Sequence, residues 1–211
     1  GWDNVQQLTR LGLPGVWTHG EFDAWSPGYL MFMAATHNGI SRLYETYGND
    51  GADTLQRILQ PHEYARTWYN PPYPKVLWSA RNNNNYQQSG LLVALNYFAG
   101  NSREFLHNFH LKSRRSVEKA RTSGPAAWVM VPDPAHAGAQ ARLLEVLRRQ
   151  HVEVHRLSSA SAVENPARKN EAGKETHPHG GRQRFPAGSY VIRMDQPYSR
   201  IADALLDRQY W

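Results

Sequence analysis

The residue of this chain best suited to acid–base chemistry is Glu45, which lies between tyrosines in the sequence ISRLYETY, residues 40–47. The alternation of side chains predicts a strand here, with Leu43, Glu45 and Tyr47 on one face and Arg42 on the other. A carboxylate held beside a reacting group can accept a proton and pass it to a leaving group. Glu45 is therefore a candidate for acid–base chemistry, although these eight residues alone favour a surface carboxylate or a buried ion-pair partner of Arg42 from a neighbouring turn.

The histidines are the other candidates for chemistry, as metal ligands. None of the ten is followed three residues later by glutamate, the spacing that places two zinc ligands on one helical turn. His107 and His110 are three apart on a predicted helix, and His177 and His179 lie in a glycine-rich stretch, but neither pair has a carboxylate at suitable spacing. We predict no metal site within this chain, and adventitious nickel or zinc binding at most near residue 177.

Composition excludes several classes of function. The absence of cysteine excludes disulfides, thiolate metal sites and a cysteine nucleophile. Much of the net charge of +6 arises from two basic tracts, residues 103–121 and 168–184, and the second has only Phe185 at its edge as an aromatic residue for stacking on nucleic acid. We therefore predict a solvated helix face and a loop, with no nucleic-acid partner. No apolar run approaches the roughly 20 residues that span a bilayer, so no membrane span is expected, and no signal sequence is recognisable.

The first part of the chain is predicted to be largely helical. Residues 2–11 read as an amphipathic helix stopped by Gly12 and Pro14. Asn85 is expected to cap a second helix over about residues 86–99, and a third helix is expected over 102–120. The predicted core face of the second helix consists of apolar residues at helical spacing, namely Leu91, Leu92, Leu95 and Phe98.

The second part alternates strands and helices. The apolar run at 126–131 predicts a strand buried on both faces, and Leu143, Leu144 and Leu147 predict the inward face of a following helix. A further strand at 152–157 completes a βαβ pattern, which favours a parallel sheet. A polar loop is expected over 158–184, followed by a strand and by a helix from Ser199 that places Ile201, Ala204 and Leu205 on one face.

Two stretches carry a resemblance to known families. The segment 15–54, with GEFDAWSPGY and RLYET, resembles the last third of the catalytic domain of zinc carboxypeptidases of the carboxypeptidase A type. The sequences GPAAWVMVPDP and FPAGSYVIRMDQPYSRIADALLDRQYW resemble the glutamine-amidotransferase-like domain appended to a bacterial branch of these enzymes. The two resemblances follow the order found in that branch and together cover most of the chain.

The resemblance implies an α/β chain with two domains. Residues 1–121 would be the C-terminal part of a zinc-carboxypeptidase-like domain without its zinc ligands, and residues 122–211 a small parallel-sheet domain of flavodoxin or amidotransferase type, without catalytic cysteine. The chain would then be a C-terminal fragment of a secreted or periplasmic zinc-dependent metallocarboxypeptidase. Its substrate would be a peptide cleaved at its C-terminal bond, and the isolated fragment would be inactive.

The resemblance also assigns roles to individual residues. Glu45 would be the general base that takes a proton from zinc-bound water, and Asp23 would line the pocket for the terminal side chain. His19 and Tyr29 would contact substrate or stabilise the transition state, although a loop hydrogen bond for His19 and a packed core ring for Tyr29 are equally compatible with the sequence. Thr46 departs from the pattern of relatives that carry an arginine nearby. The alternative function is a non-catalytic module that binds peptides or cell-wall fragments.

Overall fold

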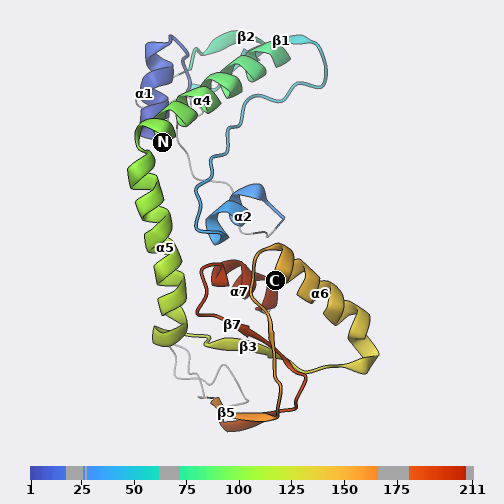
Figure 1. The fold of residues 1–211 in the computed structure, drawn as a ribbon. Coiled ribbons are helices and arrows are strands. Elements are labelled where there is room, and N and C mark those ends of the chain that lie inside the picture. The colour runs from blue at the N-terminus through green and yellow to red at the C-terminus, as the bar shows by residue number, and fades with distance from the viewer. Residues whose placement is uncertain (18–25, 27, 62–71, 166–180, 208–211) are drawn as a thin grey trace. The chain divides into compact units, whose positions relative to one another are not determined.

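The computed structural model describes residues 1–17, 26, 28–61, 72–165 and 181–207, and the chain forms two compact units (Figure 1). The first unit contains Gly1–Ala24 and Ser41–Asn108, and the second contains Trp25–Ile40 and Phe109–Trp211. The predicted assignment of residues 1–121 and 122–211 to a peptidase-like and an amidotransferase-like domain stays a prediction.

The first unit is built on two helices and a hairpin. Helix α1, Trp2–Arg10, buries Val5 and Leu8 and packs against helix α4, Ala80–Gly100, which confirms the predicted N-terminal helix. Strands β1, Thr54–Ile58, and β2, Lys75–Ser79, pair antiparallel. Strand β2 ends at Ser79 and α4 begins at Ala80, so no loop separates the strand from the helix.

Helix α4 begins earlier than predicted. Ser79 is the N-cap, and the side-chain oxygen of Asn82 accepts hydrogen bonds from the backbone N–H and the hydroxyl of Ser79, at 3.0 and 2.8 Å. These bonds use a backbone donor that the first turn of the helix cannot satisfy itself. The prediction of Asn85 as the cap was therefore wrong, because the capping residues lie one and two turns upstream. Helix α5, Ser102–Thr122, agrees closely with its prediction.

The predicted core face of α4 was also wrong. Leu91, Leu92 and Leu95 are each more than half exposed, whereas the small residues Gly90 and Ala94 are buried. Small residues on the packed face let neighbouring backbone and side chains approach the helix axis closely. The spacing of the leucines is helical, but spacing alone does not say which face of a helix is covered.

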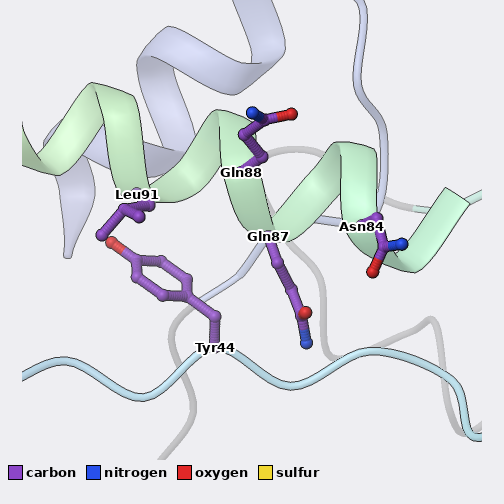
Figure 2. Close-up of a pocket in the computed structure, with 5 residues that line it drawn as sticks. All are labelled: Tyr44, Asn84, Gln87, Gln88 and Leu91. Carbon is purple, nitrogen blue, oxygen red and sulfur yellow. The ribbon is translucent and has the colours of Figure 1, made fainter. Parts of the chain in front are cut away.

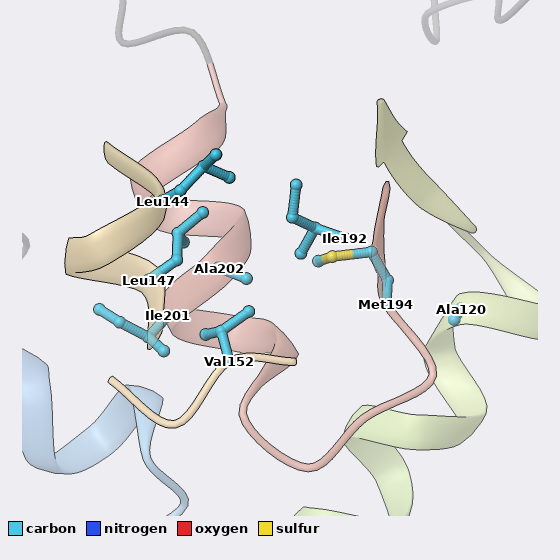
Figure 3. Close-up of a cluster of buried hydrophobic side chains, with 8 residues drawn as sticks. All are labelled: Ala120, Leu144, Leu147, Val152, Ile192, Met194, Ile201 and Ala202. Carbon is cyan, nitrogen blue, oxygen red and sulfur yellow. The ribbon is translucent and has the colours of Figure 1, made fainter. Parts of the chain in front are cut away.

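The core of the second unit lies between helices and a small sheet (Figure 3). Helices α2, Leu30–Thr36, and α7, Ser199–Leu206, contact each other, and α6, Ala137–Arg149, contributes its predicted inward leucines. A short 3-10 helix, η1, Pro134–His136, precedes α6. The buried cluster consists of Ala120, Leu144, Leu147, Val152, Ile192, Met194, Ile201 and Ala202.

The sheet of the second unit is antiparallel, so the predicted parallel flavodoxin-like sheet was wrong. Its strand order is β3-β7-β4, with β3 at Ala127–Met130, β7 at Tyr190–Arg193 and β4 at His155–Arg156. β7 pairs antiparallel with both neighbours. The strand–helix–strand order from β3 to β4 was predicted correctly, but the last strand in the chain separates the two. The coarser α/β class is confirmed.

A second correction concerns the predicted polar loop at 158–184. Residues Ser161–Asn165 form β5 and Gly181–Phe185 form β6, and these strands pair antiparallel as a separate two-stranded sheet. Polar side chains can occupy both faces of such a hairpin, which hides it from a search for apolar alternation. None of the helices in the described ranges is long and apolar enough to cross a membrane.

Candidate functional site

Glu45 lies in the segment 41–49, which has no regular secondary structure, so the predicted strand at 40–47 was wrong. Strands β1 and β2 pair with each other and not with this segment. Hydrogen bonds from the side chains of Asn4 and Asn83 hold the segment in place. Glu45 is exposed, and within the described ranges its carboxylate forms no hydrogen bond or ion pair. Arg42 instead influences the N-terminus, because its charge adds to burial in lowering the pKa of the Gly1 amino group.

The residue before Glu45 is anchored on the two helices of the first unit. The amide nitrogen of Asn4, a buried residue of α1, donates to the Tyr44 hydroxyl at 2.5 Å and to the carbonyl oxygen of Gly90 at 3.3 Å. A Cβ atom on Gly90 would lie 3.1 Å from Cε1 of the Tyr44 ring. The absence of a side chain at position 90 therefore allows the ring to rest directly on α4.

The residues after Glu45 are anchored by Asn83 of α4. Its amide nitrogen donates to the carbonyl oxygen of Tyr47 at 2.7 Å and to Oδ1 of Asn49 at 3.1 Å. Its side-chain oxygen accepts a hydrogen bond from Nε1 of Trp78, the buried aromatic residue of β2. One carboxamide thus joins the hairpin, the helix and the segment that carries Glu45.

Aromatic side chains support the same anchor. The rings of Tyr47 and Trp78 meet edge to face with centroids 5.1 Å apart, and Tyr86 lies 5.1 Å from Trp78. The guanidinium of Arg57 lies 5.6 Å from the centre of the Tyr47 ring, within cation–π range. Burial, and then the neighbouring Tyr73 and Tyr47, raise the pKa of Tyr86, so this phenol stays neutral at physiological pH.

An open pocket of about 600 Å³ lies beside this segment (Figure 2). It is lined by one aromatic ring, three carboxamides and one apolar side chain: Tyr44, Asn84, Gln87, Gln88 and Leu91. Gln87 also reaches the segment itself, since its amide nitrogen lies 3.4 Å from the Thr46 hydroxyl. None of the described residues that line the pocket is charged, and this lining suits a neutral ligand.

The described residues do not fit a bound zinc ion. Within the described ranges, no three His, Cys, Asp or Glu side chains come together in a group able to hold a metal. His107 lines a second open pocket of about 470 Å³ at the junction of α4 and α5, where Arg103 and Glu104 are its charged neighbours. A zinc site would need ligands beyond these residues, and the structure assigns no chemical step to a metal.

Of the other predicted site residues, Asp23, His19 and Tyr29, the structure describes only Tyr29. Asp23 and His19 lie outside the described residues. Tyr29 is 46% exposed at the N-cap of α2 and belongs to the second unit, whereas Glu45 belongs to the first. The packed-ring alternative for Tyr29 is therefore not what the structure has, and its contact with substrate stays a prediction.

Sequence reasoning missed the carboxamides that hold the segment. Asn4 and Asn83 are polar residues on predicted helices, and neither is a common catalytic type. A signal for Asn83 was present, since six of the seven residues 82–88 are Asn or Gln, and asparagine is a poor helix former. Such a run inside a helix indicates that some of these side chains form hydrogen bonds outside the helix.

Comparisons with protein-family models, with curated proteins and with solved structures found no match to this chain.

Proposed function

We propose that the intact protein is a metallocarboxypeptidase, in which this chain supplies the general base and part of the substrate site. Glu45 accepts a proton from the water that attacks the C-terminal peptide bond and passes it to the amine that leaves. The metal ligands lie outside the described residues, and a secreted or periplasmic location belongs to the same proposal. The second unit serves as a structural or substrate-positioning part.

One observation carries this proposal: an exposed carboxylate with no intramolecular partner among the described residues lies in a segment anchored on both sides. Tyr44 and Tyr47 are fixed by carboxamides from α1 and α4, so the backbone at Glu45 is restrained while its side chain is open to solvent. A general base needs this combination of a fixed position and access to the substrate. A surface carboxylate would also be exposed and unpaired, and the experiment below separates the two roles.

The test is hydrolysis by the full-length protein of a short peptide with a free C-terminus and of the same peptide with an amidated C-terminus. We expect cleavage of the free peptide only, inhibition by a metal chelator, and a loss of about 10²- to 10⁴-fold in kcat for Glu45→Gln. The matched control is Glu104→Gln, because Glu104 is also exposed in the first unit. Equal activity of the two variants would overturn the role of Glu45.

A second candidate function is a non-catalytic peptide-binding module. The observation that favours it is the carboxamide pocket beside Tyr44, whose described lining offers hydrogen-bond donors and acceptors and contains no acidic or basic side chain. Binding of uncharged peptide by full-length protein that cleaves neither peptide would select this function over the first.

A further inference from the structure

Four of the residues 82–88 are asparagines, which are poor helix formers. Each asparagine in a helix interior costs a few tenths of a kcal/mol or more relative to alanine, because its side chain competes for backbone hydrogen bonds. The fold uses two of these residues directly. Asn82 caps the helix with Ser79, and Asn83 joins Trp78 to the segment that carries Glu45.

Three further carboxamides, those of Asn84, Gln87 and Gln88, have no such use in the fold. All three are exposed and line the pocket beside Tyr44 (Figure 2). Within the described ranges, Asn84 and Gln88 form no side-chain hydrogen bond, and Gln87 has only its long contact with Thr46. Their donors and acceptors are therefore available to a ligand.

The spacing of these side chains determines what they can bind. Residues three and four apart on a helix are roughly 5–6 Å from each other. In an extended peptide, equivalent groups two residues apart are separated by roughly 6.5–7 Å. A carboxamide carries both a donor and an acceptor, as a peptide unit does. The carboxamides of Asn84 and Gln88, four residues apart, can therefore bond alternate peptide units of one extended chain, since long side chains accommodate the small difference in spacing.

The rest of the pocket agrees with an uncharged peptide. The ring of Tyr44 and the side chain of Leu91 lie together in it and provide an apolar surface for a small side chain (Figure 2). The orientation of the Tyr44 ring is fixed by the bond from Asn4 and by its close contact with Gly90. A fixed ring loses little conformational entropy when a ligand binds.

We propose that the carboxamide face of α4, defined as Asn84, Gln87, Gln88 and Leu91 together with Tyr44, binds the main chain of an extended, uncharged peptide segment. The proposal rests on the proposed function, because the peptide bound here is the substrate upstream of the cleaved bond. The proposed subsite binds the peptide backbone and does not depend on the charge of the peptide's side chains.

The experiment measures binding of a terminally blocked peptide of alternating alanine and glycine, carrying an uncharged BODIPY label, to full-length protein by fluorescence anisotropy, with Glu45→Gln present throughout to prevent cleavage. The added pair Asn84→Ala and Gln88→Ala should weaken binding about tenfold, as expected for the loss of two or more hydrogen bonds. Alanine favours the helix at both positions, so the fold is retained. Raising NaCl from about 50 to 500 mM should change the affinity less than about twofold, since no charge is involved.

The matched control is Asn85→Ala, which removes a neighbouring exposed asparagine that does not line the pocket. Its affinity should stay within about twofold of the parent. Unchanged affinity for the pair variant, equal weakening by the control, or tighter binding of a neutral oligosaccharide than of the peptide would each overturn the subsite. Binding that collapses with salt would assign the peptide to the basic tracts instead.

The two proposals fail in different ways. If the pair variant leaves KM unchanged while Glu45→Gln abolishes hydrolysis, the subsite is refuted and the peptidase stands. If Glu45→Gln leaves hydrolysis intact, the proposed catalytic role is refuted, whereas the anisotropy measurement still decides whether the carboxamide face binds peptide.

Discussion

At the scale of single residues, carboxamides hold the candidate base in place. Asn4 fixes the residue before Glu45, and Asn83 fixes the backbone two residues after it. Both are neutral, so they restrain the segment without placing a counter-charge beside the carboxylate. A lysine or arginine in either position would instead favour the ionised form and weaken Glu45 as a base.

Asn83→Ala should lower the free energy of unfolding by about 1–3 kcal/mol, because it leaves the buried Nε1 of Trp78 and the Tyr47 carbonyl without their partner. Denaturant unfolding followed by tryptophan fluorescence measures the change. Asn85→Ala, in the same turn but exposed, is the control and should be neutral or slightly stabilising. Equal stabilities of the two variants would show that Asn83 does not hold the segment.

The residue scale was also where sequence reasoning was most limited. Glu45 was assigned as the general base from the resemblance of residues 15–54 to zinc carboxypeptidases, and its exposure is compatible with that prediction without testing it. The anchors were missed because Asn4 and Gly90 act across 86 positions of chain, and local spacing does not report such contacts.

At the scale of elements, the sequence of α4 allows the Tyr44 ring to pack closely against the helix. Gly90 is buried in the middle of the helix although glycine is a poor helix former there. The cost is offset by the close packing of the Tyr44 ring, which a larger residue would prevent.

Gly90→Ala should therefore gain little or lose stability, although alanine favours the helix, because its Cβ would lie 3.1 Å from Cε1 of Tyr44. Gly100→Ala is the matched control at the end of the same helix, where a Cβ meets nothing within 4 Å. We expect this control to raise the free energy of unfolding by up to about 0.5 kcal/mol, because the last residue of a helix gains less from alanine than an interior residue does. Thermal unfolding of both variants tests the comparison, and an equal gain would contradict the contact.

The elements themselves were largely predictable, and their partners were not. Helices α1, α5 and α6 follow local periodicity and stop signals, so their positions agree with the sequence. The exposure of Leu91 and the antiparallel sheet depend on what packs against each element. The exposed face of a helix and the pairing of strands depend on contacts between distant parts of the chain, and a local sequence pattern does not specify these contacts.

At the scale of the whole molecule, the second unit depends on one buried cluster between its helices and its sheet. Leu147 of α6 is fully buried there, and the side chains around it come from α5, α6, α7 and the strand β7 (Figure 3). The cluster therefore joins elements that are far apart in the sequence.

Leu147→Ala should destabilise the protein by about 2–5 kcal/mol, because it removes apolar contacts and leaves a cavity. Val146→Ala, on the exposed side of the same helix, should cost about 0.5 kcal/mol or less. Chemical denaturation monitored by circular dichroism compares them. Similar losses for the two variants would place the stability of this unit elsewhere than in the cluster.

The central position of β7 has a consequence for synthesis. β3 and β4 emerge from the ribosome first, yet each hydrogen-bonds only to β7 within this sheet. Until residues 190–193 are available, both strands present unsatisfied edges that favour association with other chains. Nascent chains halted before that point should therefore require chaperone protection, and this sheet forms only when its central strand is available.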